Sequence, residues 1–152
     1  MPDANDPHDL NRFVEAQKGS GSLSDYDTAL AEIRAGDKVT HWMWYIFPQF
    51  DGLGFSPMAQ RYAIKSRAEA GAYLAHPVLG PRLVACAEAA LGVEGKSAFD
   101  IFGDPDDLKL KSCGTLFACV SPSGSVFHRL IDALFDGQRD EKTIRLLARS
   151  GK

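Results

Sequence analysis

The run His41–Gln49, which reads HWMWYIFPQ, constrains the fold of this chain more than any other segment. From Trp42 to Phe47, six apolar or aromatic residues follow one another without a polar break, and both tryptophans of the chain are among them. A helix or strand at the surface keeps its apolar residues on one face, so this run must be covered by protein on both sides. We therefore predict that it passes through the core. It is the one β-prone segment of the chain, and its length also fits an extended segment packed between helices.

The remainder of the chain has the three-and-four spacing of amphipathic helices, and strong strand patterns are nearly absent. Ser24 is a candidate N-cap, and glycines or prolines mark most of the expected helix ends. In the last segment we expect Ile144 and Leu147 to be buried. The expected helical segments are 10–17, 24–36, 57–65, 66–76, 81–91, 97–103 (a short helix or a turn), 104–120, 125–136 and 140–149.

This pattern predicts one compact all-α domain with about seven helices and at most a minor extended element. The 152 residues suffice for a real core, and 45% hydrophobic with 24% charged residues is the composition of an ordinary globular protein. We expect a single domain over residues 1–152, with its core between about residues 9 and 149 and with residues 1–7 disordered.

Charge and hydropathy exclude several classes of protein. The formal net charge is −3, whereas a protein that binds nucleic acid mainly by neutralising phosphates is usually basic. Local recognition of a nucleotide stays open. No apolar run approaches the roughly 20 residues of a membrane span. The N-terminal sequence MPDANDPHDL lacks the basic and apolar regions of a secretory signal, so we expect a cytoplasmic protein; the oligomeric state is left open.

The three cysteines, Cys86, Cys113 and Cys119, predict neither a disulfide framework nor a metal site. Their number is odd, no C-x-x-C spacing occurs, and the four histidines are scattered along the chain. We expect buried free thiols, no bound metal and no cofactor.

The polar members of the aromatic run are the first candidates for a binding site. His41, Trp44, Tyr45 and Gln49 carry hydrogen-bonding groups that need partners wherever they are buried. In one interpretation these residues form the wall of a ligand site. In the other they belong to a packed aromatic core that contains an ordinary capped histidine.

A glycine-rich turn follows directly, and it is the second candidate. Gly52, Gly54 and Ser56 precede Pro57, the expected start of a helix, so backbone N–H groups of this turn can approach a phosphate. The spacing and the lysine of a P-loop are missing, and a plain turn explains the same residues. Farther along, Arg82 can bind a carboxylate or phosphate through both of its terminal nitrogens.

The third candidate is a pair of lysines in the segment DDLKLKSCGTLF. Lys111 shares a helix face with small residues, and Asp107 lies four positions before it, which is a favourable ion-pair spacing. A partly buried Lys111 that faces a pocket would have a lowered pKa and could act in acid–base or imine chemistry. Lys109 lies on another face of the same helix. A solvated lysine pair at a helix start is the alternative.

Five segments then occur in an order that resembles a known family. They read RFVEAQ, DYDTALAEIRAGDKVTHWMWYIFPQFDGLG, EAGAYLAHPVLGPRL, IFGDPDDLKLKS and TLF. Together, from about Leu10 to Leu147, they resemble the bacterial family catalogued as domain of unknown function 1810. Members are sometimes labelled calpastatin, a disordered inhibitor whose composition this chain does not share. The resemblance implies a mainly helical fold, and the family is distantly similar to a helical superfamily that processes ADP-ribose and related nucleotides and includes riboflavin-pathway N-glycosidases.

The chain departs from this family at one position. Relatives commonly read KSSMTLF where residues 111–117 read KSCGTLF, so Gly114 replaces a large side chain. The substitution predicts either a larger local pocket or a locally weakened helix.

These features support the hypothesis that the chain binds a nucleotide or an ADP-ribose-like small molecule. Trp44 or Tyr45 would stack on the base, while Gln49 and His41 would orient the base or the ribose. The glycine turn or Arg82 would hold the phosphate.

The reaction that the resemblance implies is cleavage of an N-glycosidic bond. Its catalytic set would be Lys111, Asp107 and His41, with Lys109 at the binding site. The alternatives are a non-catalytic module that binds a small molecule or peptide, and an interaction protein whose aromatic segment contacts a partner chain. A concave site lined by His41, Trp44, Gln49 and Lys111 would favour ligand binding, and a flat exposed patch would favour a partner.

Overall fold

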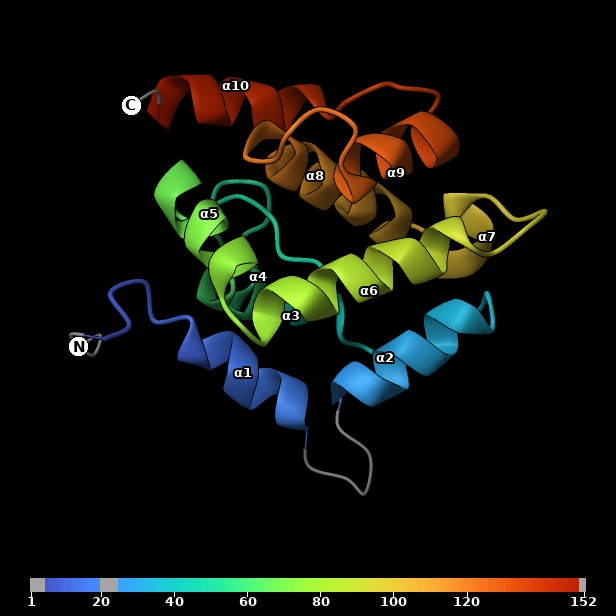
Figure 1. Cartoon of the computed structure of the whole chain (residues 1–152), viewed down its shortest axis with the longest axis horizontal. Helices are drawn as coiled ribbons and strands as arrows, with labels where there is room; N and C mark the ends of the chain where they lie inside the picture. Colours follow the sequence, from blue (N-terminus) through green and yellow to red (C-terminus); the bar gives the residue numbers. More distant parts are fainter. Residues whose placement is uncertain (1–4, 20–24, 151–152) are drawn as a thin grey trace.

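The computed structural model describes residues 5–19 and 25–150, and within these residues the fold is all-α, as predicted. The helices pack into one compact body, with α6 and α8 running through its middle (Figure 1). The helices are α1 (Asn11–Lys18), α2 (Asp25–Arg34), α3 (Met43–Ile46), α4 (Pro57–Arg61), α5 (Arg67–Ala75), α6 (Leu79–Leu91), α7 (Ala98–Phe102), α8 (Asp106–Cys119), α9 (Val126–Phe135) and α10 (Glu141–Ser150).

Several of these helices begin at a residue whose side chain accepts a hydrogen bond from a backbone N–H of the first turn. Ser66 caps α5, Ser97 and Asp100 form a capping box at α7, and Ser125 caps α9. At α10 the Asp140 carboxylate accepts a hydrogen bond from the Thr143 backbone N–H at 2.9 Å. The candidate cap Ser24 lies outside the described residues.

The stretch before α1 contains a cap that the sequence analysis did not anticipate. Asp6 falls within residues 1–7, which were expected to be disordered, and residues 1–4 lie outside the described part of the chain. The Asp6 carboxylate accepts hydrogen bonds from the backbone N–H groups of Leu10 at 2.7 Å and Asn11 at 2.9 Å. This carboxylate therefore satisfies two donors at the start of α1.

The aromatic run passes through the core, as predicted. Trp42, Met43, Ile46 and Phe47 are buried. The run is a single helical turn, α3, followed by an extended stretch, rather than a strand along its length. The minor extended element is a single parallel bridge between Phe50 and Ile64.

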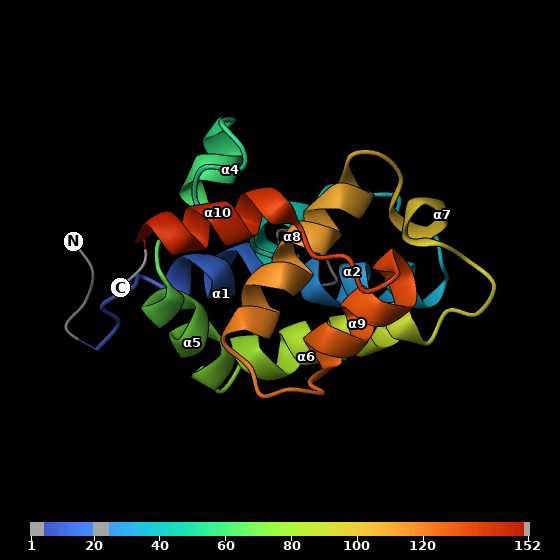
Figure 2. The same ribbon diagram turned by 90° about the horizontal axis from the view of Figure 1, so that it is seen from above.

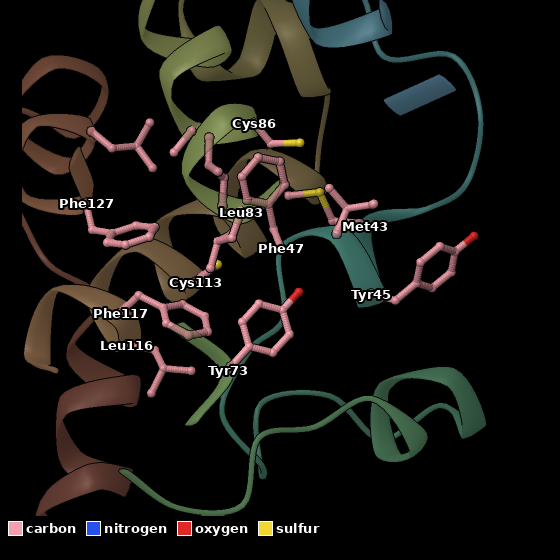
Figure 3. Close-up of a cluster of buried hydrophobic side chains, with 14 of the residues drawn as sticks. Met43, Tyr45, Phe47, Tyr73, Leu83, Cys86, Cys113, Leu116, Phe117 and Phe127 are labelled. Carbon is pink, nitrogen blue, oxygen red and sulfur yellow. The ribbon is translucent and has the colours of Figure 1, made fainter. Parts of the chain in front are cut away.

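The core is centred on α8, which packs against α5, α7, α9 and α10. In Figure 3, the Phe117 ring of α8 lies between Tyr73 of α5 and Phe127 of α9, with ring centroids 5.5 Å and 5.6 Å away. Seen from above, α10 lies over α8, and α4 projects at one edge of the body (Figure 2). Residues at the starts of α4, α8 and α10 come together with Trp44 and Gln49 of the aromatic run.

Gly114 allows close packing between two helices and opens no pocket. A Cβ at this position would lie 3.1 Å from the Ile131 side chain and 3.4 Å from that of Leu130, both on α9. The first of the two expectations for Gly114, a larger local pocket, is therefore wrong. Helix α8 runs without interruption through this residue, and α9 fills the space that a larger side chain would occupy.

Two cysteines are buried free thiols, as expected. Cys86 and Cys113 are buried, Cys119 is half-buried, and none of the three forms a disulfide. Burial raises the pKa of the Cys86 thiol to about 12 and that of Cys113 well above its ordinary value. Both thiols are therefore protonated at neutral pH and serve as small apolar groups of the core.

The orientation of α10 differs in part from the prediction. Leu147 is buried, but Ile144 is 40% exposed, and Thr143 is buried instead. The Thr143 hydroxyl donates a hydrogen bond to the Asp140 carboxylate, so this polar side chain is satisfied on the inner face. Among the described residues, no helix is long and apolar enough to cross a bilayer.

Candidate functional site

A hollow of about 340 Å³ opens between the glycine turn and the first turns of α8 and α10. We name it the Trp44 hollow. Its aromatic walls are Trp44 and Phe55, and its polar groups come from segments far apart in the sequence. The polar and charged lining residues are Gln49, Ser56, Lys109, Ser112, Asp140 and Lys142.

Trp44 and Lys109 form one side of this hollow. Residues on either side of Trp44 in α3 are buried, whereas Trp44 is half-buried and faces outward. The Lys109 ammonium lies 5.2 Å from the centroid of the Trp44 ring. A cation at this distance is attracted by the negative face of the indole, so the two side chains present an aromatic surface and a positive charge together.

Gln49 offers a free amide to the same hollow. Its backbone carbonyl accepts a hydrogen bond from the Ile64 N–H at 2.9 Å, which fixes the extended stretch beside the Phe50 bridge. Its side-chain amide makes no hydrogen bond to any residue that the structure describes. A fixed backbone with an unengaged amide is suited to hydrogen bonding with a ligand.

Phe55 and Lys142 face each other across the mouth of the hollow. The Phe55 side chain is 74% exposed, and the Lys142 ammonium lies 5.9 Å from its ring centroid. Phe55 comes from the glycine turn and Lys142 from the first turn of α10. This pair repeats, in a more exposed setting, the lysine-over-aromatic arrangement at Trp44.

Asp140 contributes a carboxylate that is held firmly in place. It accepts hydrogen bonds from the backbone and hydroxyl of Thr143, and its own N–H donates to the Thr115 hydroxyl at 2.9 Å. The N-terminal end of α10 is thereby tied to α8. This carboxylate is the acidic group of the hollow.

A second hollow of about 270 Å³ lies on the other side of the Trp44–Lys109 wall. We name it the Lys38 hollow. It shares Trp44 and Lys109 with the first hollow and adds Lys38, His41 and Asp106. The His41 side chain is exposed at this position.

About half of the residues proposed from the sequence come together at these two hollows. Trp44, Gln49, Gly54, Ser56 and Lys109 line the first, and His41 lines the second together with Trp44 and Lys109. The other five, which are Lys111, Asp107, Tyr45, Arg82 and Gly52, lie outside both linings.

The expected convergence of Lys111 with the indoles is wrong. Lys111 lines a wider depression against residues 138–142 and Ile144. Residues 109 and 111 are separated by about 200° around a helix of 3.6 residues per turn, so only one can face Trp44, and it is Lys109. The expected pair with Asp107 does not form either. The Asp107 carboxylate accepts a hydrogen bond from the Leu108 N–H at 2.9 Å, and among the described residues it makes no ion pair with Lys111.

Tyr45 and Arg82 serve other parts of the fold. The Tyr45 hydroxyl donates to the Asp25 carboxylate, and its ring centroid lies 5.4 Å from that of Tyr62. Burial, and then the bond to Asp25, raise the Tyr45 pKa above its ordinary value. The Arg82 guanidinium donates to the Gln17 side chain at 3.1 Å.

The glycine turn is explained by packing rather than by a phosphate. A Cβ on Gly54 would lie 2.8 Å from the Ala59 side chain. Gly52, which lies against the Leu146 side chain, has a φ of +100°, a backbone conformation that favours glycine. The Ser56 hydroxyl accepts a hydrogen bond from the Ala59 N–H at 3.1 Å, which caps α4. At this helix start the N–H groups of Ala59 and Gln60 are therefore already engaged, by the Ser56 hydroxyl and the Ser56 carbonyl.

Sequence reasoning missed several residues of the two hollows, among them Phe55, Lys38, Asp106, Asp140 and Lys142. Of these residues, Phe55 has a signal in the sequence, because it is a large apolar residue inside a glycine turn. The charged residues have no such signal, because charged residues near helix ends are common on ordinary surfaces. No three His, Cys, Asp or Glu side chains of the described chain gather as a metal site would require.

Comparison with known proteins places the chain in a family. Residues 7–147 match the family described as "Protein of unknown function (DUF1810)". The chain belongs to this family. Its structure is similar to that of the conserved hypothetical protein Rv1873 from Mycobacterium tuberculosis, with a TM-score of 0.89, 48% identity, and coverage of 94% of this chain and 99% of that one. No curated protein matches the chain. The family and the fold are thereby established, and neither name specifies a ligand or a reaction.

Proposed function

We propose that the Trp44 hollow binds a small molecule that has a planar ring and an anionic group, of the nucleotide or ADP-ribose class. The observation that carries this proposal is the Lys109 ammonium, held 5.2 Å over the Trp44 ring at the boundary of two hollows. One position offers both a stacking surface and a counter-charge. Such a pairing suits a ligand in which a base and a phosphate are joined.

The other groups of the hollow fit the same ligand. Stacking of a base on an aromatic side chain contributes about 1–3 kcal/mol, and the hollow offers two such side chains, the half-buried Trp44 and Phe55, which is 74% exposed. Lys109 and Lys142 supply two cations for an anionic group, and the free Gln49 amide can bind the edge of a base. A hollow of about 340 Å³ lies within the range of small-molecule sites.

The reaction that we propose for this ligand is hydrolysis of its N-glycosidic bond: the bond between the sugar carbon and the base nitrogen breaks, the oxygen of a water molecule bonds to that carbon, and the base leaves with a proton from the water. Positive charge develops on the sugar during such a cleavage, and a nearby carboxylate stabilises it. In the Trp44 hollow that carboxylate is Asp140, which takes the place first assigned to Lys111 and Asp107. Asp140→Asn would retain the cap of α10, since asparagine caps helices as well as aspartate does. It should reduce release of free base from a bound nucleotide while leaving binding in place.

The binding proposal is tested by thermal shift with NAD, ADP-ribose, mononucleotides and sugar phosphates. A ligand at ten times its Kd raises the free energy of unfolding by about 1.4 kcal/mol, which is readily detected. For any ligand that shifts the wild type, Lys109→Met should weaken binding about tenfold, the contribution of one charged hydrogen bond.

Lys111→Met is the matched control, because it removes the same charge from the same helix on a face that does not line the hollow. It should leave the affinity unchanged. Equal weakening by both variants would mean that only the overall charge matters and would contradict the assigned site.

A protein partner is the second candidate function. Phe55 is 74% exposed and Leu108 is 55% exposed at the rim of the Trp44 hollow, and exposed apolar side chains that lie together favour an interaction surface. The absence of a shift with every compound would favour this second function. Loss of a partner on Phe55→Ser would then identify the surface.

A further inference from the structure

One carboxylate, Asp106, lies between two lysines, and each lysine lies over one of the two tryptophans. The Lys38 ammonium is 2.8 Å from Asp106 Oδ2 and 4.8 Å from the Trp42 ring centroid. The Lys109 ammonium is 3.5 Å from Asp106 Oδ1 and 5.2 Å from the Trp44 ring centroid. These five side chains form a continuous row along the wall between the two hollows.

Lys38 is fully engaged by the protein itself. Its side chain is 5% exposed, and its ammonium donates to the Thr40 carbonyl at 2.7 Å in addition to pairing with Asp106. Its backbone N–H donates to the Ile101 carbonyl at 2.8 Å. Its ammonium also lies against the face of Trp42, so the protein itself already supplies Lys38 with a counter-ion, a carbonyl acceptor and an aromatic contact.

Lys109 differs from Lys38 in both burial and contact. Its ion-pair distance of 3.5 Å is long, and its side chain is more exposed than that of Lys38. Because Lys38 already neutralises Asp106, the row carries one net positive charge, and Lys109 is the member that can present it to a ligand.

We propose that Asp106, held by Lys38, is a positioning residue that aims the Lys109 ammonium at the anionic group of a ligand in the Trp44 hollow. This inference rests on the proposed function. Asp106 acts through Lys109 and does not itself touch the ligand, because a carboxylate would repel a phosphate.

The variant Asp106→Asn distinguishes positioning of Lys109 from a simple charge effect, because the two would change the affinity for an anionic ligand in opposite directions. If Asp106 contributed only its negative charge, its removal would strengthen the binding of an anion. If it positions Lys109, its removal lets the flexible lysine side chain sample many conformations, and binding weakens.

The ligand arm of the test uses AMP, with adenosine as the uncharged comparison. Calorimetric titration should show AMP binding about tenfold weaker to Asp106→Asn than to the wild type, with the affinity for adenosine nearly unchanged. In a Lys109→Met background, Asp106→Asn should not weaken AMP binding any further, since the residue through which it positions the charge is gone. Tighter AMP binding by Asp106→Asn would overturn the proposal.

The second arm needs no ligand. A lysine side chain held over an indole ring has NMR signals shifted upfield by the ring current of that indole. The ε-methylene protons of Lys109 should show this shift in the wild type and in Lys111→Met, and should lose it in Asp106→Asn. Retention of the shift in Asp106→Asn would refute positioning. If AMP fails to bind the wild type, the proposed function fails, and this measurement still decides whether Asp106 places Lys109.

Discussion

Glu32 supplies the acceptor for the buried Trp42 indole N–H and for the two residues that precede the aromatic run. Its carboxylate accepts from Trp42 Nε1 at 2.9 Å, from the backbone N–H groups of Val39 at 2.9 Å and Thr40 at 3.0 Å, and from the Thr40 hydroxyl at 2.7 Å. Sequence reasoning anticipated that a buried indole N–H needs an acceptor. It could not identify the acceptor, because Glu32 belongs to α2 and meets Trp42 only after the loop between them has folded back.

Glu32→Gln should lower the free energy of unfolding by about 1–3 kcal/mol at neutral pH, as expected for hydrogen bonds to a charged group. Burial alone would raise the Glu32 pKa, but the hydrogen bonds from Thr40, Val39 and Trp42 outweigh it, and the pKa lies below its ordinary value of 4.5. The carboxylate therefore stabilises the fold fully above pH 4.5, and this contribution is lost as the pH falls through the lowered pKa of the folded state. Urea unfolding of both proteins at pH 7 and at pH 3 should show a difference that shrinks in acid.

Glu15→Gln is the control for this prediction. Glu15 pairs with Lys18 at the surface, and exposed pairs of this kind contribute about 1 kcal/mol or less. A difference for Glu32→Gln that is as small as the control, or one that grows in acid, would contradict the assigned role.

At the scale of elements, one helix ends well before the residue that the sequence predicts. Helix α4 ends at Arg61, although the sequence pattern extended it to about Lys65, because Ile64 pairs with the aromatic run. The Ile64 N–H donates to the Gln49 carbonyl, and the Ile64 carbonyl accepts from the Asp51 N–H. A contact between two distant segments thus overrides the local preference for helix.

The close approach of α6 to α5 depends on Gly80, in the first turn of α6, which the sequence does not distinguish from other glycines. A Cβ on Gly80 would lie 2.1 Å from the Leu74 carbonyl oxygen, a backbone atom that cannot move aside. Gly80→Ala should therefore destabilise the protein by about 3 kcal/mol or more, at the upper end of overpacking effects. Thermal unfolding of the purified variant measures this loss.

Gly71→Ala is the matched control within the preceding helix. A Cβ on Gly71 meets no atom within 4 Å, so alanine should stabilise α5 by about 0.5–1 kcal/mol through its higher helix propensity. Similar melting temperatures for the two variants would show that the contact with Leu74 does not limit the packing of α5 against α6.

At the scale of the whole molecule, Arg12 ties the N-terminal region to the α4–α5 segment. Its guanidinium donates to the carbonyls of Arg61 at 2.8 Å and Ala63 at 2.9 Å and pairs with Glu69 at 2.7 Å. The Glu69 side chain is only 3% exposed and also accepts from the Lys65 N–H. One residue of α1 therefore closes a loop of more than fifty residues, Arg12 to Glu69.

Arg12→Met should lower the free energy of unfolding by about 3–5 kcal/mol, because it leaves the buried Glu69 charge without its partner. Lys18→Met removes an equivalent charge from the same helix, where Lys18 and its partner Glu15 are both exposed, and should cost less than about 1 kcal/mol. Denaturant unfolding of both variants compares them directly. Equal and small losses would mean that the Arg12 network contributes nothing to stability.

The sequence by itself determined the all-α class, the passage of the aromatic run through the core, and the burial of the Cys86 and Cys113 thiols. Helical periodicity and an unbroken apolar run are local patterns, and burial follows from them directly. The tertiary structure alone decided that Lys109 rather than Lys111 faces the indoles, and that Asp140 and Lys142 join Trp44 at one hollow. Those contacts depend on how α8 and α10 are rotated and packed within the whole molecule. Side chains that are distant in the sequence decide that packing together, and no local sequence pattern records it.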